Sequence, residues 1–313
     1  MPVPVLEFQN VVKRFGDFTA VDDLSFHVER GRVFGFLGRN GAGKTTSMRM
    51  VLDILRPTSG DIRVFGEAPG GPARGRTGFL PEERGLYRRM NVVEIIAYFG
   101  ELKGMSRGDA TASAQRLAAE FDLAQWGAKP VDALSKGMAQ KVQLACAIVN
   151  APELVILDEP FSGLDPISQG SLETTILDLA AKGATVIFST HVMQHAERLC
   201  DELLLISKGR KVFDGDLAQA RAVLPVKITL TSQQDPRSVD LVESATAGPA
   251  DADGWTQWEV VLKKGTLAAS LLEACFERGL RLHRFDEHKP SLHEVFLHLA
   301  GDDAAETETR SAA

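Results

Sequence analysis

The sequence is poor in cysteine and in long apolar runs. Its 313 residues include 3 cysteines, Cys146, Cys200 and Cys275, which are widely spaced and form no C-x-x-C pair. This pattern indicates neither a disulfide framework nor a zinc site, so we expect a reducing, cytoplasmic setting. No apolar run approaches the roughly 18 residues that a membrane helix needs, and no charged-then-apolar leader opens the chain. If the protein works at a membrane, another chain is expected to supply the span.

The sequence also lacks an excess of basic residues. The formal net charge is −7, which argues against a general nucleic-acid binder while leaving room for a local basic patch. Apolar residues, in contrast, make up 44% of the chain. That is enough to build the cores of one large domain and one smaller domain.

A glycine-rich run at residues 38–45, GRNGAGKT, matches every fixed position of the phosphate-binding loop G-x-x-x-x-G-K-[ST]. It follows an apolar strand expected at 32–37 and precedes apolar spacing typical of a helix at 45–55. In such a loop the backbone N–H groups wrap the phosphates, Lys44 reaches the terminal phosphates and the Thr45 hydroxyl holds Mg²⁺. A purely structural turn needs neither the lysine nor the hydroxyl. The run therefore predicts a site for a nucleoside triphosphate.

The larger part of the chain has the pattern of an α/β domain. Alternating apolar and polar positions at 3–30 indicate antiparallel strands with one covered face. Continuous apolar runs at 154–157 and 184–189 alternate with helical stretches and indicate strands buried in a parallel sheet. Residues 91–133 are helical in pattern, with a capping-box start at Asn91 and Glu94 and a second helix at 109–120. The segment 65–77, dense in glycine and proline, is expected to be an exposed loop.

The character of the sequence changes near Pro225. Strands are expected at 226–230, 256–262 and 280–286, and helices at 266–278 and 291–299. These elements suffice for a small α+β domain. The polar stretch 232–253 is expected to be a loop, and the acidic, small-residue-rich stretch 301–313 is expected to be disordered.

Two carboxylates, Asp158 and Glu159, follow the apolar run at 154–157. They therefore lie just past the carboxyl end of a buried strand, where open α/β sheets bind their ligands. Asp158 is positioned to bind Mg²⁺, and Glu159 to orient or deprotonate the water that attacks the terminal phosphate. Alone, an Asp-Glu-Pro sequence could equally end a strand and begin a turn. Beside a phosphate loop, the catalytic interpretation is favoured.

His191 follows the apolar run at 184–189 and is expected to project toward the same crevice. A phosphate-facing imidazole suits this place. The competing interpretation is a zinc pair with His195, four residues later, but Val192 stands where a metalloprotease motif needs Glu. The phosphate-facing role is therefore favoured.

Further motifs give the chain a family resemblance. The phosphate loop, LSKGMAQK at 134–141, Asp158-Glu159, SGLD at 162–165 and His191 occur in the order that marks ATP-binding cassette ATPases. The chain resembles this family over residues 3–222 and more weakly over 226–301. The resemblance implies a P-loop NTPase core with an antiparallel β subdomain and a helical signature subdomain at about 91–150, all within an ATP-binding domain at 1–222. A small α+β accessory domain at 223–301 and a disordered acidic tail at 302–313 complete the expected organisation.

The resemblance implies a composite ATP site. In this family two cassettes pack head to tail, and the signature of each covers the γ-phosphate held by the other. Ser135 and Gly137 would then act in trans, with Asp165 near the shared interface. Ser135 also opens a helix expected to end near residue 149, so it can equally be a helix cap, and it can be both.

The resemblance also assigns roles within the chain, with ATP and Mg²⁺ as the expected cofactors. Phe15 is implied to stack on adenine, with Val21 as a small apolar contact beside it, although Phe15 could equally be a core aromatic. The implied ATP-binding residues are Phe15, Val21, Gly38, Arg39, Asn40, Gly41, Ala42, Gly43, Lys44, Thr45 and Thr46. The implied catalytic residues are Glu159 and His191, and the implied metal ligands are Thr45, Glu82 and Asp158.

The chain departs from the family pattern at a few positions. Glu82 stands where glutamine is usual, in the loop that contacts Mg²⁺ and meets the membrane partner. A carboxylate can still bind Mg²⁺, but it adds a negative charge near Asp158 and Glu159. Lys136, Met138 and Arg39 also replace commoner residues. Because Ser135, Gly137 and all fixed positions of the phosphate loop remain, activity is expected to be kept.

The resulting functional hypothesis is the ATPase subunit of an exporter. The loop at 78–87 and the SKGM sequence resemble the subgroup of sodium-extrusion and drug-export cassettes, which implies a second cassette, a separate polytopic permease, and a place on the cytoplasmic face of the membrane. The alternative is a soluble cassette ATPase acting on nucleic acid or the translation machinery. Only 90 positions separate Thr45 from Ser135, which leaves no room for the long coiled coil of the DNA-end class. Translation-type proteins carry two cassettes in one chain, whereas this chain has one of each motif.

Overall fold

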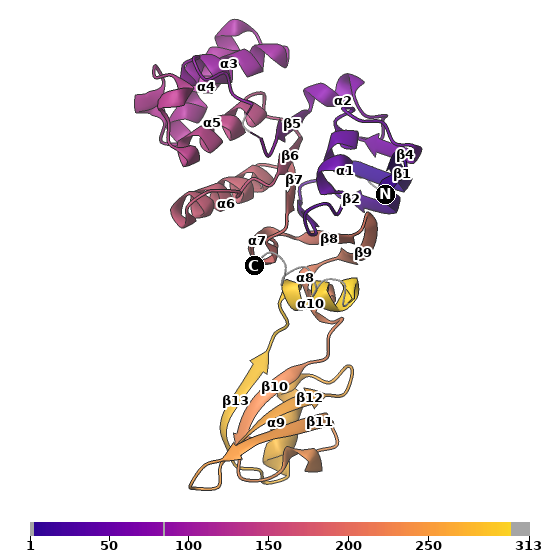
Figure 1. Cartoon of the computed structure of the whole chain (residues 1–313). Helices are drawn as coiled ribbons and strands as arrows, with labels where there is room; N and C mark the ends of the chain where they lie inside the picture. Colours follow the sequence, from indigo (N-terminus) through magenta and orange to yellow (C-terminus); the bar gives the residue numbers. More distant parts are fainter. Residues whose placement is uncertain (1–2, 84, 302–313) are drawn as a thin grey trace. The chain divides into compact units, whose positions relative to one another are not determined.

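The computed structural model describes residues 3–83 and 85–301 (Figure 1). The predicted disordered tail at 302–313 therefore lies outside the described residues. Contacts divide the chain into two compact units, Met1–Asp216 and Leu217–Ala313. In the part of the chain that the structure describes, no helix has both the length and the apolar character needed to cross a membrane.

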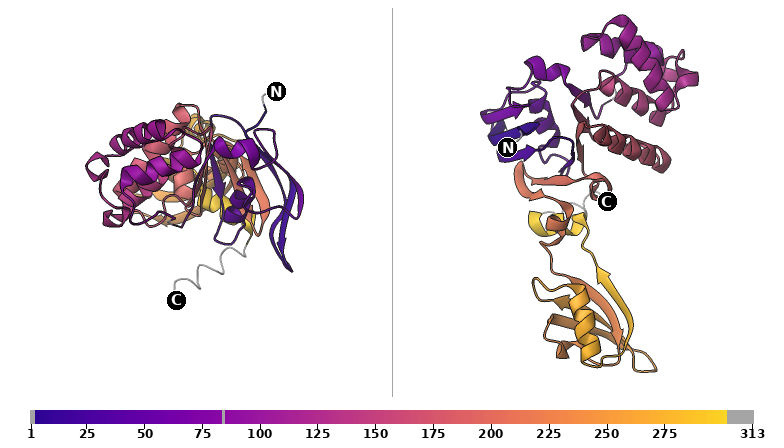
Figure 2. Two further views of the ribbon diagram at one scale, coloured as in Figure 1. Left: turned by 90° about the horizontal axis from the view of Figure 1, so that it is seen from above. Right: turned by 180° about the vertical axis from the view of Figure 1, so that it is seen from behind.

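Two sheets and a group of helices build the first unit (Figures 1 and 2). A three-stranded antiparallel sheet has the order β2-β1-β4, with β1 Leu6–Phe15, β2 Phe18–Val28 and β4 Ser59–Val64. A six-stranded sheet has the order β5-β6-β7-β3-β8-β9, with β5 Thr77–Leu80, β6 Leu154–Asp158, β7 Thr185–Thr190, β3 Val33–Leu37, β8 Glu202–Ser207 and β9 Arg210–Gly215. All its strand pairs are parallel except β8 with β9.

The helices of this unit fall between the strands. They are α1 Lys44–Val51, α2 Gly71–Gly75, α3 Val92–Leu102, α4 Arg107–Glu120, α5 Lys136–Ile148, α6 Pro166–Ala181 and α7 Met193–Leu199, with short 3₁₀ turns η1 Ala124–Trp126 and η2 Val131–Ala133. The described chain thus has the P-loop NTPase arrangement that the sequence predicted, with an antiparallel β layer and a helical lobe formed by α3, α4 and α5 (Figure 1).

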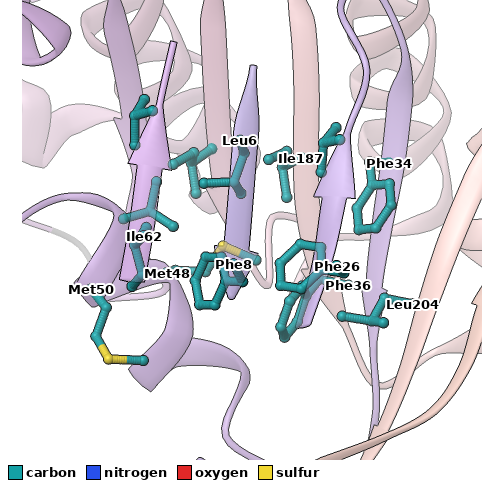
Figure 3. Packing of buried hydrophobic residues seen from close by; sticks show 14 of the residues in the cluster. Leu6, Phe8, Phe26, Phe34, Phe36, Met48, Met50, Ile62, Ile187 and Leu204 are labelled. Carbon is teal, nitrogen blue, oxygen red and sulfur yellow. The ribbon is translucent and has the colours of Figure 1, made fainter. Parts of the chain in front are cut away.

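The apolar core of the first unit joins its two sheets. Phe8 and Phe26 stack with ring centroids 4.7 Å apart, and Phe26 also meets Phe34 and Phe36 of β3. Met48 of α1 and Ile187 of β7 belong to the same buried cluster as these rings (Figure 3). The helix that follows the phosphate loop therefore packs against side chains of both sheets.

Local sequence signals account for the helical lobe. Helix α3 begins with the capping box predicted at Asn91 and Glu94, in which each residue's side chain accepts from the backbone N–H of the other. Helix α4 begins at Arg107, two residues before the predicted start, because the Ser106 hydroxyl accepts from the N–H of Asp109.

The predicted loop at 65–77 was wrong in one part. Residues Gly71–Gly75 form the short helix α2. Pro72 lies in its first turn, where a missing N–H is tolerated. The glycine and proline content of the segment indicated a loop, but a proline in the first turn of a helix is compatible with one turn of helix.

The second unit is a four-stranded antiparallel sheet with helices. Its strand order is β11-β12-β10-β13, with β10 Lys227–Ser232, β11 Val242–Ala250, β12 Thr256–Leu262 and β13 Leu282–His288. Its helices are α8 Leu217–Arg221, α9 Ala268–Glu277 and α10 Leu292–Ala300, with the 3₁₀ turn η3 Pro236–Ser238. Leu230, Trp258 and Val260 of the sheet share a core with Leu271 and Cys275 of α9. This unit has the α+β composition that the sequence predicted.

Strand β11 lies within the stretch 232–253 that was predicted to be a loop, so that prediction was wrong. The strand is at the edge of its sheet, and none of its residues is fully buried. It contains Gly248 and Pro249, which are rare inside strands. It forms as the outer strand of a hairpin with β12, and because it has no buried face, its sequence shows no apolar alternation.

Gly78 in β5 provides a test of how tightly helix α5 packs on the sheet. A Cβ at Gly78 would lie 2.3 Å from the carbonyl oxygen of Ala147 and 3.0 Å from Cγ of Pro152. We expect Gly78→Ala to lower the free energy of unfolding by about 3 kcal/mol. Gly75→Ala is the matched control, because a Cβ there meets no heavy atom within 4 Å, and it should be neutral or stabilising by less than about 1 kcal/mol. Denaturant unfolding of both variants measures the difference, and equal stabilities would contradict the packing.

Candidate nucleotide site

Three parallel strands end at the same edge of the six-stranded sheet. Leu37 of β3 pairs with Thr190 of β7, and Asp158 of β6 pairs with Ser189 of β7. The residues that follow each strand therefore meet: the phosphate loop after β3, Glu159 after β6 and His191 after β7. This is the carboxyl edge, where open α/β sheets bind ligands.

The phosphate loop depends on glycines with left-handed backbone conformations. Gly41 has φ 79° and Gly43 has φ 103°. Gly43 precedes helix α1, and a Cβ on it would lie 2.5 Å from the carbonyl oxygen of Ala20. No other residue type fits there, so the loop leads into α1 with free N–H groups at the helix start.

Lys44 is almost fully buried, with 5% of its surface exposed. Its Nζ donates to the carbonyl oxygens of Gly38 at 2.8 Å and Arg39 at 3.3 Å. It also lies 3.2 Å from Oε1 of Glu159, a contact that has the distance of an ion pair but lacks hydrogen-bond alignment. The buried ammonium is thus held at the centre of the loop with its charge balanced by the carboxylate predicted to be catalytic.

Asp158 forms a compact cluster with two hydroxyl groups. Its Oδ1 accepts from Ser189 Oγ at 2.5 Å and from Thr45 Oγ1 at 3.3 Å. Asp158 is 2% exposed. Carboxylate and hydroxyl oxygens at the start of a phosphate-binding helix are the donor set that Mg²⁺ prefers, so Thr45 and Asp158 fit a magnesium site.

Glu159 is fixed at both its backbone and its side chain. Its φ is 47°, a left-handed conformation that is uncommon for residues other than glycine and typical of functional sites. Its N–H donates to Ser189 Oγ at 3.0 Å, and Oε2 lies 3.0 Å from Nδ1 of His191. The carboxylate is therefore aimed by two neighbouring groups, the Lys44 ammonium and the His191 ring.

The predicted signature residues lie on a different element. Ser135 caps α5, and its Oγ accepts from the N–H of Met138 at 3.3 Å. A Cβ at Gly137 would lie 2.5 Å from Oγ of Ser168 in α6. Asp165 caps α6 and accepts from the Ser168 hydroxyl at 2.7 Å, which lowers the pKa of its carboxyl. Ser135 and Asp165 are both exposed. The starts of their two helices meet where Gly137 of α5 packs against Ser168 of α6, the residue that donates to Asp165.

The remaining three predicted binding residues differ in where they lie. Phe15 is 47% exposed, with Lys13 Nζ 5.0 Å from its ring centre, so it is not a core aromatic. Val21 is buried and packs beside Gly43 of the phosphate loop. Glu82 is exposed, and among the described residues its side chain makes no hydrogen bond or ion pair with Thr45 or Asp158. The roles assigned to these three residues stay predictions.

His191 and His195 belong to different clusters. His195 is buried, stacks on Phe161 at 4.0 Å between ring centres, and lies 3.1 Å from Oε1 of Glu173. His191 instead contacts Glu159. Their different partners argue against the zinc pair considered as the competing interpretation.

The sequence reasoning missed Ser189. Its hydroxyl donates to Asp158 and accepts from the N–H of Glu159, so one side chain orients both acidic residues. A signal was present, since Ser189 is a polar residue near the end of an apolar strand, two positions before His191. Its significance depends on the register of β7 with β6, which the sequence does not show.

Comparison with known proteins identifies the family. The family described as ABC transporter matches residues 21–162. An ATP-binding protein of an ABC transporter from Bacillus subtilis (strain 168), YhaQ, otherwise uncharacterised, is 35% identical over 298 residues, covering 95% of this chain and 99% of the relative. The chain belongs to the ABC transporter ATP-binding family.

A second relative and a solved structure agree with this family assignment. Nod factor export ATP-binding protein I from Burkholderia lata is 37% identical over 306 residues, covering 96% of this chain and 98% of that protein. A solved ATP-binding subunit of an ABC transporter has a TM-score of 0.64 at 32% identity and covers 69% of this chain and 92% of its own. The cassette is therefore an ATPase subunit of an ABC transporter, and similar proteins match nearly its whole length.

Substitution of Ser189 tests whether its hydroxyl orients Asp158 and Glu159. Ser189→Ala removes the donor to Asp158 and the acceptor of the Glu159 N–H, so we expect ATP turnover to fall roughly 10- to 100-fold. Thr185→Val is the matched control, because the Thr185 hydroxyl is equally buried at the other end of β7 and accepts from the N–H of Gly31. Steady-state ATPase assays compare the two. Wild-type turnover in Ser189→Ala, or an equal loss in Thr185→Val, would contradict this role.

Proposed function

We propose that this cassette is the ATPase subunit of an exporter, which dimerises on ATP and drives a separate membrane permease. One observation carries the catalytic part. Lys44, Thr45, Asp158, Glu159 and His191 converge at one sheet edge through contacts of 2.8 to 3.3 Å centred on the phosphate loop and the acidic pair.

The geometry supports separate roles for the charged groups. The N–H groups of the loop at 38–46 and the Lys44 ammonium bind the β- and γ-phosphates. Glu159 orients or deprotonates the attacking water. His191, 3.0 Å from the Glu159 carboxylate, holds that carboxylate and faces the γ-phosphate.

Thr45 and Asp158 are proposed to hold Mg²⁺, with Glu82 joining from its loop. The metal ion would neutralise charge that develops on the phosphates during transfer. The chain's own contribution is orientation. Ser189 holds Asp158, and the Thr45 hydroxyl, at the first turn of α1, points to the same carboxylate oxygen.

A second cassette is proposed to complete the site. Ser135 and Asp165 are exposed at the starts of two helices, and Gly137 lies between them. At the start of α5 the Ser135 side chain accepts only from the N–H of Met138, so the other N–H groups of the first turn suit an anion that comes from outside the chain. The partner's γ-phosphate is that anion in the proposed dimer, so closure around ATP and reopening after hydrolysis form the working cycle.

Export is supported by the names of related proteins. Several proteins that match nearly the whole chain are Nod factor export ATP-binding proteins. We infer the direction of transport from them and leave the solute open, because its pathway lies in the other chain. The proposed place of work is the cytoplasmic face of the membrane, docked on a polytopic permease.

Glu159→Gln tests the catalytic assignment. The amide keeps the shape of the side chain but cannot accept a proton, so we expect ATP binding to persist while turnover falls roughly 10²- to 10⁴-fold. With ATP and Mg²⁺ the variant should accumulate as a dimer. Equilibrium dialysis, ATPase assays and light scattering during gel filtration measure these properties.

The matched control is Glu153→Gln, at the opposite end of β6. Glu153 binds Arg76 and Arg30 at the surface, so its loss should leave turnover and dimerisation unchanged. A Glu159→Gln protein that stays monomeric and hydrolyses ATP at the wild-type rate would contradict the proposal.

The transport role has its own test. A tagged full chain purified from membranes in mild detergent should bring with it a polytopic membrane protein, and adding that protein in vesicles should stimulate the ATPase. Tight binding to nucleic acid, with no membrane chain recovered, would overturn the exporter assignment in favour of the soluble alternative.

A further inference from the structure

One face of helix α5 contacts three segments around the nucleotide site. Gly137, Gln140 and Gln143 are spaced three residues apart, which places them along one side of the helix. Gly137 lies against Ser168, beside Asp165. Gln140 and Gln143 reach two further segments, so the helix that Ser135 opens is tied to the site along its length.

Gln140 is bound to the turn that follows the catalytic carboxylate. Its Nε2 donates to the carbonyl oxygen of Pro160 at 3.1 Å. Pro160 is the residue directly after Glu159, and Gln140 is 7% exposed. Ser189 thus holds the backbone N–H of Glu159, and Gln140 holds the backbone carbonyl of the next residue, so the chain is fixed on both sides of the Glu159 side chain.

Gln143 is bound to the loop that carries Glu82. Its Nε2 donates to the carbonyl oxygens of Pro81 and Glu83, both at 3.2 Å. Gln143 is 5% exposed, and its Oε1 has no hydrogen-bond partner among the described residues. Carbonyl oxygens only accept hydrogen bonds, so the nitrogen of the amide must face the loop.

The two carbonyl groups belong to the residues on either side of Glu82. The loop at 81–83 forms neither helix nor strand, and the Glu82 side chain is exposed without a bond to Thr45 or Asp158 among the described residues. Hydrogen bonds from the Gln143 side chain to the backbone on both sides of Glu82 therefore hold the segment that carries this residue.

We propose that Gln143 is a positioning residue that ties the Glu82 loop to the signature helix. Through it, the end of α5 that Ser135 caps and the loop that carries Glu82 move as one body. This rests on the proposed function for the part Glu82 plays at the metal, whereas the tie between helix and loop stands on the contacts alone.

The first test measures amide hydrogen exchange in the Glu82 loop of the nucleotide-free protein. Gln143→Met keeps the length of the side chain and removes the donor, so amide hydrogen exchange in the peptide that spans residues 81–83 should rise about tenfold. Gln143→Ala, which introduces no clash, should give the same pattern. Exchange in the phosphate loop should not change in either variant.

Asn150→Leu is the matched control. The Asn150 side chain, just past the end of α5, also donates from its amide to a backbone carbonyl, that of Gly75 at 2.7 Å, and its Oδ1 is likewise buried without a partner in the described part of the chain. It should lower the unfolding temperature without changing exchange at residues 81–83. Unchanged exchange in both Gln143 variants, or an equal rise in Asn150→Leu, would overturn the proposal.

The second test is a double-mutant cycle with Glu82→Ala. Gln143→Met alone should raise the Mg²⁺ concentration for half-maximal ATPase activity and lower kcat about tenfold, with ATP binding in the absence of Mg²⁺ retained. In the Glu82→Ala background, it should add no further loss, because it acts through Glu82. Losses that multiply would overturn the proposal. Full activity of Glu82→Ala alone would instead refute the proposed metal role of Glu82, and the exchange result would still decide whether Gln143 holds the loop.

Discussion

The register of three parallel strands is the constraint on which the site depends. Hydrogen bonding of β3 with β7 and of β7 with β6 brings Leu37, Thr190 and Asp158 to a common edge. Each functional segment is simply the continuation of one strand, so no long side chain has to cross the fold. A slip of one residue between β6 and β7 would turn Ser189 away from Asp158, because successive side chains of a strand point to opposite faces.

Much of the site could be predicted because its residues lie next to strong local signals. The phosphate loop has glycines that its backbone angles require. Asp158 ends an apolar strand, and Glu159 and His191 directly follow one. Ser189 and Gln143 could not be found in this way. Their partners are 31 positions away for Ser189 with Asp158 and about 60 positions away for Gln143 with its loop, so pairing and helix orientation decide their roles.

The fold was predictable to the same degree and for the same reason. Strand β12 has the predicted bounds, and α5 begins at the predicted cap, because apolar alternation and a serine cap are local properties. Strand β11 and helix α2 were missed. The first is an exposed edge strand held by its neighbour β12, and the second is a single turn whose glycines and proline suggest a loop.

Gly137 shows how the lack of a side chain at one position can matter for two reasons, packing within the cassette and the proposed dimer. The hydroxyl of Ser168 fills the place that a Cβ would take, and that hydroxyl is bonded to the cap of α6. A side chain at Gly137 therefore disturbs the packing within its own cassette. Genetic inactivation at this glycine reports on folding of the α5–α6 junction as well as on contacts in the proposed dimer. Ser135 is exposed, and in the described part of the chain its side chain makes a hydrogen bond only at its own helix start, so it is the position where the two contributions separate.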